Sequence, residues 1–178
     1  MKICLYVFLC TSIFSGAMAQ NSPGVFDGSM DIGKPKIAGS ASYSNADQVY
    51  TLKGAGYNIW FGRDEFHFAH KKLKGDFILT ANFEFVGAGT DPHRKVGWMI
   101  RTSPEDNAAH VSATYHGDGL TVLQWRELKG AFMRDPEDEI RFSKKKVGVM
   151  QLERSGRVIT MRVANWGEPL QVVGSISP

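Results

Sequence analysis

Hydrophobic and polar residues alternate along most of the chain, which is the pattern of half-buried β-strands. The clearest run covers residues 76–86, in which the odd-numbered positions are apolar and the even-numbered positions are mostly polar. Successive side chains of a strand point to opposite faces, so the odd-numbered set predicts one continuous apolar face. Further strands are predicted at residues 95–101, 110–116, 120–126, 147–153 and 157–164, with shorter ones at 41–44, 48–53, 57–61 and 65–69.

Short turns between these runs predict hairpins. Gly117-Asp118-Gly119 separates residues 110–116 from 120–126, and Arg154-Ser155-Gly156 separates the last two long runs. Glycine and aspartate supply the backbone conformations that tight hairpins need. No stretch of ten or more residues has apolar side chains at helical spacing. The sequence therefore predicts an all-β fold, an antiparallel β-sandwich of the jelly-roll type, as a single domain over residues 20–178. Residues 129–146, an acidic cluster followed by three lysines, are expected to form a solvated surface loop.

The N-terminus has the features of a secretory signal peptide. A lysine precedes an apolar run at residues 3–14, and Ala17-Met18-Ala19 offers small residues for cleavage, which predicts a signal over 1–19. The run is shorter than the roughly 20 residues of a membrane span, so no span is expected after cleavage. Both cysteines fall within the signal. A chain exported without cysteine or a glycosylation acceptor fits a bacterial periplasmic or secreted protein better than a eukaryotic one.

Composition and motifs exclude several functional classes. Hydrophobic residues make up 43% of the chain and charged residues 22%, as in an ordinary globular domain, and a net charge of +3 gives no reason to expect nucleic-acid binding. No local motif for a hydrolase, a metal site or a phosphate-binding loop is present. Asp64 and Glu65 are adjacent, so on a strand they would point to opposite faces and could not act as a pair. We therefore expect no catalytic residue, no metal and no cofactor.

A binding face is the more productive interpretation. Amides, carboxylates and guanidinium groups on the polar faces of neighbouring strands match the hydroxyls of a glycan, each of which both donates and accepts. Trp60, beside a Gly-Arg-Asp turn, is expected to offer a flat stacking surface, whereas Trp98 and Trp125 alternate with apolar residues and are expected in the core. The other interpretation is that this face is simply solvated. The predicted ligand-binding residues are Trp60, Glu65, His67, Asn82, Glu84, Arg101, His116, Gln124 and Arg126.

Several motifs resemble a known module. They are NIWFGRDEFHF at residues 58–68, KGDFILTA at 74–81, DPHRKVGWMIR at 91–101 and HGDGL at 116–120. Together they are similar to the N-terminal module of exported Bacteroidetes proteins of the TolB-like or biopolymer-transporter kind, over residues 25–174. That resemblance implies a concanavalin A-like lectin/glucanase sandwich of unknown function, and it carries over no catalytic residue. Such modules continue into a further strand pair and a β-propeller, whereas this chain ends at Pro178, so we expect an unpaired sheet edge open to association.

These observations predict an exported, non-catalytic binding module with a glycan as the favoured ligand. Two alternatives stay open. The first is a glycoside hydrolase or lyase whose carboxylates come from separate strands, such as Glu65 and Glu84. The second is a protein-interaction module of a TolB-like envelope protein, which would show a contiguous exposed apolar patch.

Overall fold

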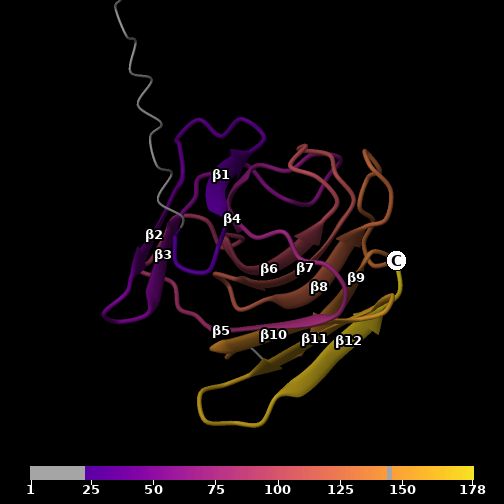
Figure 1. Cartoon of the computed structure of the whole chain (residues 1–178). Helices are drawn as coiled ribbons and strands as arrows, with labels where there is room; N and C mark the ends of the chain where they lie inside the picture. Colours follow the sequence, from indigo (N-terminus) through magenta and orange to yellow (C-terminus); the bar gives the residue numbers. More distant parts are fainter. Residues whose placement is uncertain (1–22, 144–145) are drawn as a thin grey trace, which may run out of the picture.

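A computed structural model describes residues 23–143 and 146–178, and these residues contain β-strands and no helix (Figure 1). The predicted signal segment, residues 1–19, lies outside the described residues. No described segment forms a helix with the length and apolar character needed to cross a membrane. The strands are β1 (Gly28–Ile32), β2 (Ser40–Ser44), β3 (Val49–Lys53), β4 (Phe66–His70), β5 (Phe77–Asn82), β6 (Lys95–Arg101), β7 (His110–His116), β8 (Thr121–Arg126), β9 (Glu139–Phe142), β10 (Val149–Ser155), β11 (Val158–Ala164) and β12 (Gln171–Ile176).

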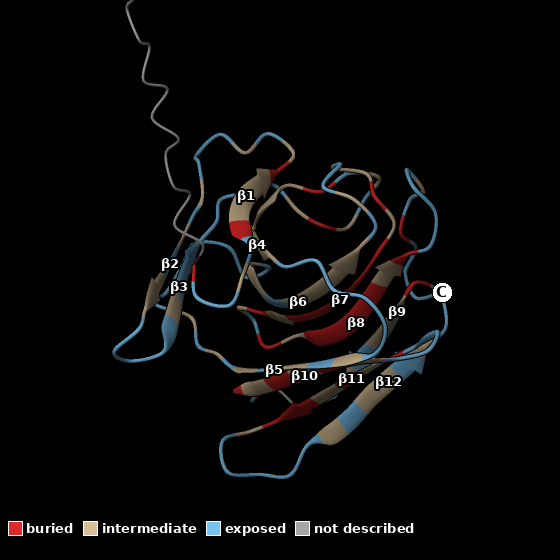
Figure 2. Cartoon of the chain, viewed as in Figure 1, coloured by how far each residue is buried: buried red, intermediate tan, exposed pale blue. Residues whose placement is uncertain are grey.

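Two four-stranded antiparallel sheets pack face to face. One has the order β12-β11-β10-β5 and the other the order β6-β7-β8-β9. Figure 2 shows that the buried residues are concentrated in the central strands of both sheets. Of two smaller antiparallel sheets, β1-β4 lies beyond the outer side of β6-β7-β8-β9, and β2-β3 lies beside one end of the sandwich, at the left of the view (Figure 1). The prediction of an all-β antiparallel sandwich is confirmed at this level of detail.

The core between the sheets is formed by side chains that alternate along the central strands, as the sequence pattern predicts. Full burial of each large aliphatic side chain contributes about 1.5–3 kcal/mol to folding. Trp98 and Trp125 pack against this core, and Trp98 Nε1 donates a hydrogen bond to the Met150 carbonyl oxygen at 3.2 Å. Their predicted core positions are confirmed. The buried core residues are Val111, Ala113, Leu123, Val147, Met150, Leu152, Ile159, Met161 and Val163.

Some strand predictions were wrong, each for a local reason. Residues 129–146 do not form only a surface loop, because β9 lies within them and pairs with β8. Its two charged residues alternate with Ile140 and Phe142, which pack on the core, and the neighbouring charges hide this short alternation in the sequence. Strands β1 and β12 were also missed. The strand predicted at residues 57–61 is instead an irregular segment that crosses the outer face of a sheet.

Candidate functional site

The outer face of the sheet β6-β7-β8-β9 is polar, as the sequence predicts, but it is not open to solvent. Strand register places Met99, Ser112, Gln124 and Glu139 in one cross-strand row. The next row holds Arg101, His110 and Arg126. Ser112, Gln124, His110 and Arg126 are all buried. Because these polar side chains are buried although they point away from the core, another part of the chain must cover this face of the sheet.

The cover is the segment of residues 57–65, which we term the covering segment. At the start of β6, Lys95 Nζ donates a hydrogen bond to Asn58 Oδ1 at 3.0 Å. At the end of the same strand, the Arg101 guanidinium donates to Asp64 Oδ2 at 3.4 Å. The covering segment therefore runs along the whole length of β6, and Ile59 is buried between these two contacts.

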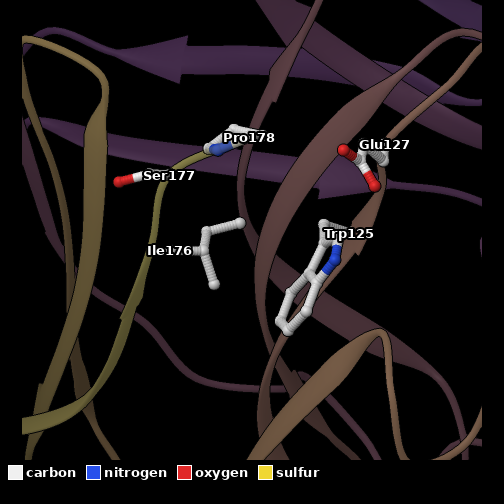
Figure 3. A pocket seen from close by; sticks show the side chains of 5 residues that line it. All are labelled: Trp125, Glu127, Ile176, Ser177 and Pro178. Atoms are coloured by element: carbon white, nitrogen blue, oxygen red, sulfur yellow. The ribbon is translucent and has the colours of Figure 1, made fainter.

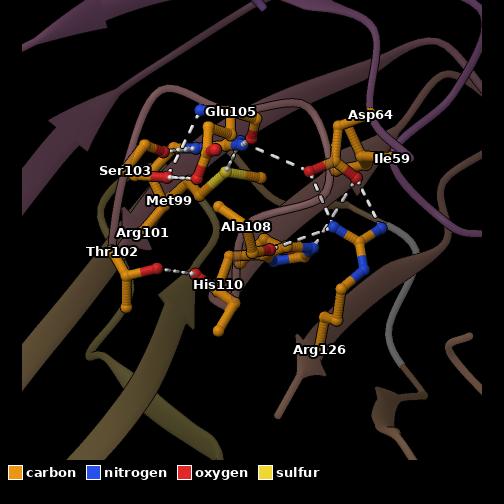
Figure 4. A network of polar contacts seen from close by, with 12 residues as sticks. Ile59, Asp64, Met99, Arg101, Thr102, Ser103, Glu105, Ala108, His110 and Arg126 are labelled. Carbon is orange, nitrogen blue, oxygen red and sulfur yellow. Dashed lines mark hydrogen bonds and ion pairs between the residues drawn. The ribbon is translucent and has the colours of Figure 1, made fainter. Parts of the chain in front are cut away.

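Asp64 is the centre of a buried charged cluster under the covering segment (Figure 4). Its two carboxylate oxygens accept hydrogen bonds from Arg126 Nη2 and Nη1, at 2.7 Å and 2.9 Å. Arg101 approaches the same carboxylate, and His110 Nε2 lies 3.8 Å from it. Bidentate arginine–carboxylate pairs are among the strongest polar contacts in proteins, and in this cluster the pair is removed from water.

Arg126 also joins three loops of the molecule through their backbones. Its guanidinium donates hydrogen bonds to the carbonyl oxygens of Phe61 (2.7 Å), Ala108 (3.1 Å) and Ala131 (3.1 Å). These carbonyls belong to the covering segment, to the loop between β6 and β7, and to the loop after β8. Together with the two bonds to Asp64, they use all the donor nitrogens of the side chain. Arg126 therefore fixes the positions of three loops relative to the sheet.

The prediction that Arg101, His116, Gln124 and Arg126 form an open ligand-binding face is wrong. The structure brings all four onto one sheet face, but their side chains are buried and most of their polar atoms are bonded within the protein, although Gln124 Oε1 has no hydrogen-bond partner among the described residues. Arg101 donates to the carbonyl oxygens of Ser103 and Glu105 as well as to Asp64, and Gln124 Nε2 donates to Glu139 Oε2 at 3.3 Å. Alternation along a strand cannot reveal a loop that closes over the face.

Two buried histidines lie at opposite ends of this face and are uncharged at neutral pH. Burial lowers the pKa of His110 to about 3, assisted by the charges of Arg126 and Arg101. Burial also lowers the pKa of His116 to about 4, assisted by the charge of Lys95. Burial in turn lowers the pKa of Lys95. Neither histidine has the solvent access that a ligand-binding group needs.

Above the charged cluster, three aromatic side chains lie at the surface. Tyr57 is 62% exposed, Phe61 40% and Phe132 70%. The rings of Tyr57 and Phe61 have centroids 6.2 Å apart and are inclined by 25°, and Phe132 meets Phe61 edge-on at 6.5 Å. The Phe132 ring also approaches Gly62, where an added Cβ would lie 3.3 Å from it. We term Tyr57, Phe61 and Phe132 the aromatic platform.

Charged groups beside the aromatic platform occur in compensated pairs. Arg63 forms an ion pair with Glu65, and its guanidinium lies 5.6 Å from the centroid of the Tyr57 ring. Lys129, in the loop that carries Phe132, forms an ion pair with Glu105 at 2.8 Å. The surroundings of the rings are polar but close to neutral in charge.

Three predicted residues lie in or next to the covering segment. Trp60 is half-buried, so its neighbours Tyr57 and Phe61, and not Trp60, provide the exposed rings. Glu65 is near the platform, where it accepts hydrogen bonds from Arg63 and from the Tyr57 backbone N–H, and the Arg63 bond lowers its pKa. His67 is on β4, where Nδ1 contacts Asp31 Oδ1 of β1 at 2.8 Å and the side chain is nearly buried. The prediction that His67 faces a ligand is therefore wrong.

Asn82 and Glu84 lie elsewhere in the molecule. Both are exposed, Asn82 at the end of β5 and Glu84 just beyond it, in the sheet opposite β6-β7-β8-β9. The outer faces of the two sheets of a sandwich point in opposite directions. The prediction of one site containing these residues and Arg101 is wrong, because strand alternation separates inner from outer faces but does not say to which sheet an outer face belongs.

The sandwich also has a shallow hollow at one end, beside the last residues of the chain (Figure 3). It is lined by Trp125, Glu127, Ile176, Ser177 and Pro178. Among its lining side chains, that of Glu127 is the one that carries a charge. Among residues 23–143 and 146–178, no group of three or more histidine, cysteine, aspartate or glutamate side chains is placed to hold a metal ion.

Comparisons with protein-family models, curated proteins and solved structures gave no match to this chain.

Proposed function

We propose that this chain is an exported, non-catalytic carbohydrate-binding module that stacks sugar rings on the aromatic platform. The observation that supports the proposal is the clustering of three exposed rings on two loops that one buried arginine holds in place. Exposed aromatic surface is unfavourable in water and marks interaction sites when it is contiguous. Loops fixed in advance lose little conformational entropy on binding, which favours affinity.

The chemistry of the platform suits a neutral glycan. The apolar C–H face of a sugar ring can pack on an aromatic ring, while its hydroxyls require donors and acceptors at the rim. Arg63 and Lys129 offer donors, and Glu65 and Glu105 offer acceptors. Both members of the Lys129–Glu105 pair are exposed, and exposed ion pairs contribute little to stability, about 0–1 kcal/mol, so these two residues can exchange partners for hydroxyl groups at small cost.

Our proposal includes a concanavalin A-like jelly-roll fold for the sandwich. Two four-stranded antiparallel sheets and the motifs at residues 58–68 and 91–101 support a concanavalin A-like jelly roll. The apolar run at residues 3–14 supports export. The hydrolase alternative gains no support, because Glu65 is held by Arg63 next to β4 whereas Glu84 follows β5 in a different sheet.

A glycan-array screen of the purified chain, followed by calorimetry with the best ligand, tests the proposal. Phe132→Ala and Tyr57→Ala should each weaken binding about tenfold or more, since each removes ring contact worth about 1.5–3 kcal/mol if fully buried by the ligand. Trp166→Ala is the matched control, because Trp166 is a 60% exposed aromatic residue on the loop between β11 and β12. A screen without a glycan ligand, or a ligand whose affinity is unchanged in both platform variants, contradicts the proposal.

A further inference from the structure

The free edges of the two four-stranded sheets differ in how they are protected. Natural edge strands avoid pairing with other chains by carrying charges, by being short or by containing a bulge. Strand β6 begins with Lys95 and ends with Arg101, β9 has four residues of which two are charged, and β12 has a register shift opposite Met161 and Arg162. Strand β5, with the sequence FILTAN, has six residues, no charge, no proline and a regular register with β10.

We propose that the edge of β5 is a docking site for a second copy of this chain, which pairs its own β5 antiparallel to form a continuous eight-stranded sheet. An antiparallel pair of identical strands has two-fold symmetry, so the interface closes on a dimer. An uncharged strand suits this symmetry, because pairing it with itself brings no like charges together.

The backbone of β5 has hydrogen-bonding groups directed to the outside. The Phe83 N–H, just past the strand, donates to the Gly148 carbonyl oxygen on the side of β10. Backbone groups alternate along a strand, so those of Leu79 and Ala81 also face β10. The N–H and C=O groups of Ile78, Thr80 and Asn82 therefore face away from it. In the described part of the chain, no other segment forms a backbone hydrogen bond with these three residues.

Side chains and charges favour one register for the dimer. The outer face of β5 consists of Ile78, Thr80 and Asn82, and outer residues of one copy have to pair with outer residues of the other for the sheet to stay continuous. Pairing Ile78 with Thr80 of the second copy places Asp76 opposite Asn82. The register Thr80 with Thr80 places Asp76 opposite Glu84, where the two carboxylates repel. The register Ile78 with Ile78 moves Lys74 opposite the uncharged Asn82, so it lacks the pairing of Lys74 with Glu84.

The favoured register also brings opposite charges together at both ends of the pair. It directs Lys74 of each copy, which precedes the bend at Gly75, toward the end of the pair that carries Glu84 of the other copy. Both residues are exposed, and neither forms an ion pair within the described part of the chain. The 60% exposed Ile78 side chain would then lie about 7–8 Å from its symmetry mate, diagonally across the interface. Charge complementarity and an unprotected strand thus favour a second copy over an unrelated peptide.

Sedimentation equilibrium of the purified chain, with a matched pair of variants, tests the proposal. Ile78→Lys places like charges across the interface and should shift the chain toward monomer at least tenfold in dissociation constant. Val172→Lys introduces the same charge at a 59% exposed position on β12, the opposite edge of the same sheet, and should leave the dimer intact. Far-ultraviolet circular dichroism and the melting temperature check that both variants are folded.

Exchanging the charges of Lys74 and Glu84 tests the proposed register of the dimer. Both residues lie outside β5, so the strand itself is unchanged. Lys74→Glu and Glu84→Lys should each weaken the dimer, and the double variant should restore it. Three results would overturn the proposal: a wild-type chain that is monomeric into the high micromolar range, a dimer that Val172→Lys disrupts as strongly as Ile78→Lys, or a double variant that is weaker than both single ones. If β5 instead pairs with a peptide from a different protein, the purified wild-type chain would be monomeric.

Discussion

Removing the charge of Asp64 should strongly destabilise the fold. Asn has nearly the same size as Asp and keeps one acceptor oxygen, so Asp64→Asn isolates the effect of charge. The buried guanidinium groups of Arg126 and Arg101 would lose the carboxylate that compensates them. Breaking a buried ion pair by removing one partner costs about 3–5 kcal/mol, because the remaining charge stays out of water.

The loss can be measured by urea and thermal unfolding followed by tryptophan fluorescence. For a chain of this size, 1 kcal/mol shifts the melting temperature by about 2–4 °C, so we expect a decrease of about 6–20 °C. Asp135→Asn is the control, because Asp135 is exposed and pairs with the exposed Arg141 at 3.1 Å. It should change stability by less than about 1 kcal/mol. A loss below about 1 kcal/mol for Asp64→Asn would refute a stabilising role for the buried cluster.

Two further changes test other parts of the structure. Because the pKa values of His110 and His116 are lowered from 6.5 to about 3 and about 4, the unfolded chain binds protons that the folded chain does not. Stability should therefore be full above about pH 6.5 and fall by about 1.4 kcal/mol per pH unit for each histidine as the pH drops toward 4. Urea titrations across this range measure the slope, and a flat profile would contradict the lowered pKa values, because it would mean that both rings bind protons in the folded chain as readily as in the unfolded one. The close contact of β6 with β7 at Gly97 is a separate test. An added Cβ there would overlap the Ala113 carbonyl oxygen, so Gly97→Ala should lower the free energy of unfolding by about 1–3 kcal/mol. Gly156 has open space around it, so Gly156→Ala should affect stability only through the positive φ of that residue. A loss well below about 1 kcal/mol in Gly97→Ala would contradict this view of the β6–β7 contact.

The sequence predicted strands well where alternation is long. Residues 95–101 and 110–116 were placed with the bounds that the structure shows, and the apolar face of residues 77–82 is directed inward. Alternation is a local property, and the positions of Trp98 and Ile100 toward the core follow from it directly. It fails for a strand as short as β9, in which charged residues stand between the core residues.

The candidate site was harder to predict because it depends on contacts between distant segments. Arg126 was expected at a surface, yet its burial results from the backbone carbonyls of three loops that no local pattern identifies. Phe61 and Phe132 are far apart in the sequence and meet because Arg126 holds both loops. One local feature of the sequence did indicate the aromatic platform: the aromatic-rich stretch at residues 57–61 precedes a Gly-Arg-Asp turn. This feature favoured an exposed ring in the region but did not identify which ring is exposed.

The way Arg126 holds the platform has a consequence for protein engineering. Its contacts with the two aromatic loops are to main-chain carbonyl oxygens, which every amino acid possesses. The side chains at positions 57, 61 and 132 can therefore be randomised while the framework beneath them stays the same. Loops on a rigid framework are the places where proteins acquire new recognition properties. A combinatorial library at these three positions, built on residues 20–178, would give a cysteine-free scaffold for selecting binders.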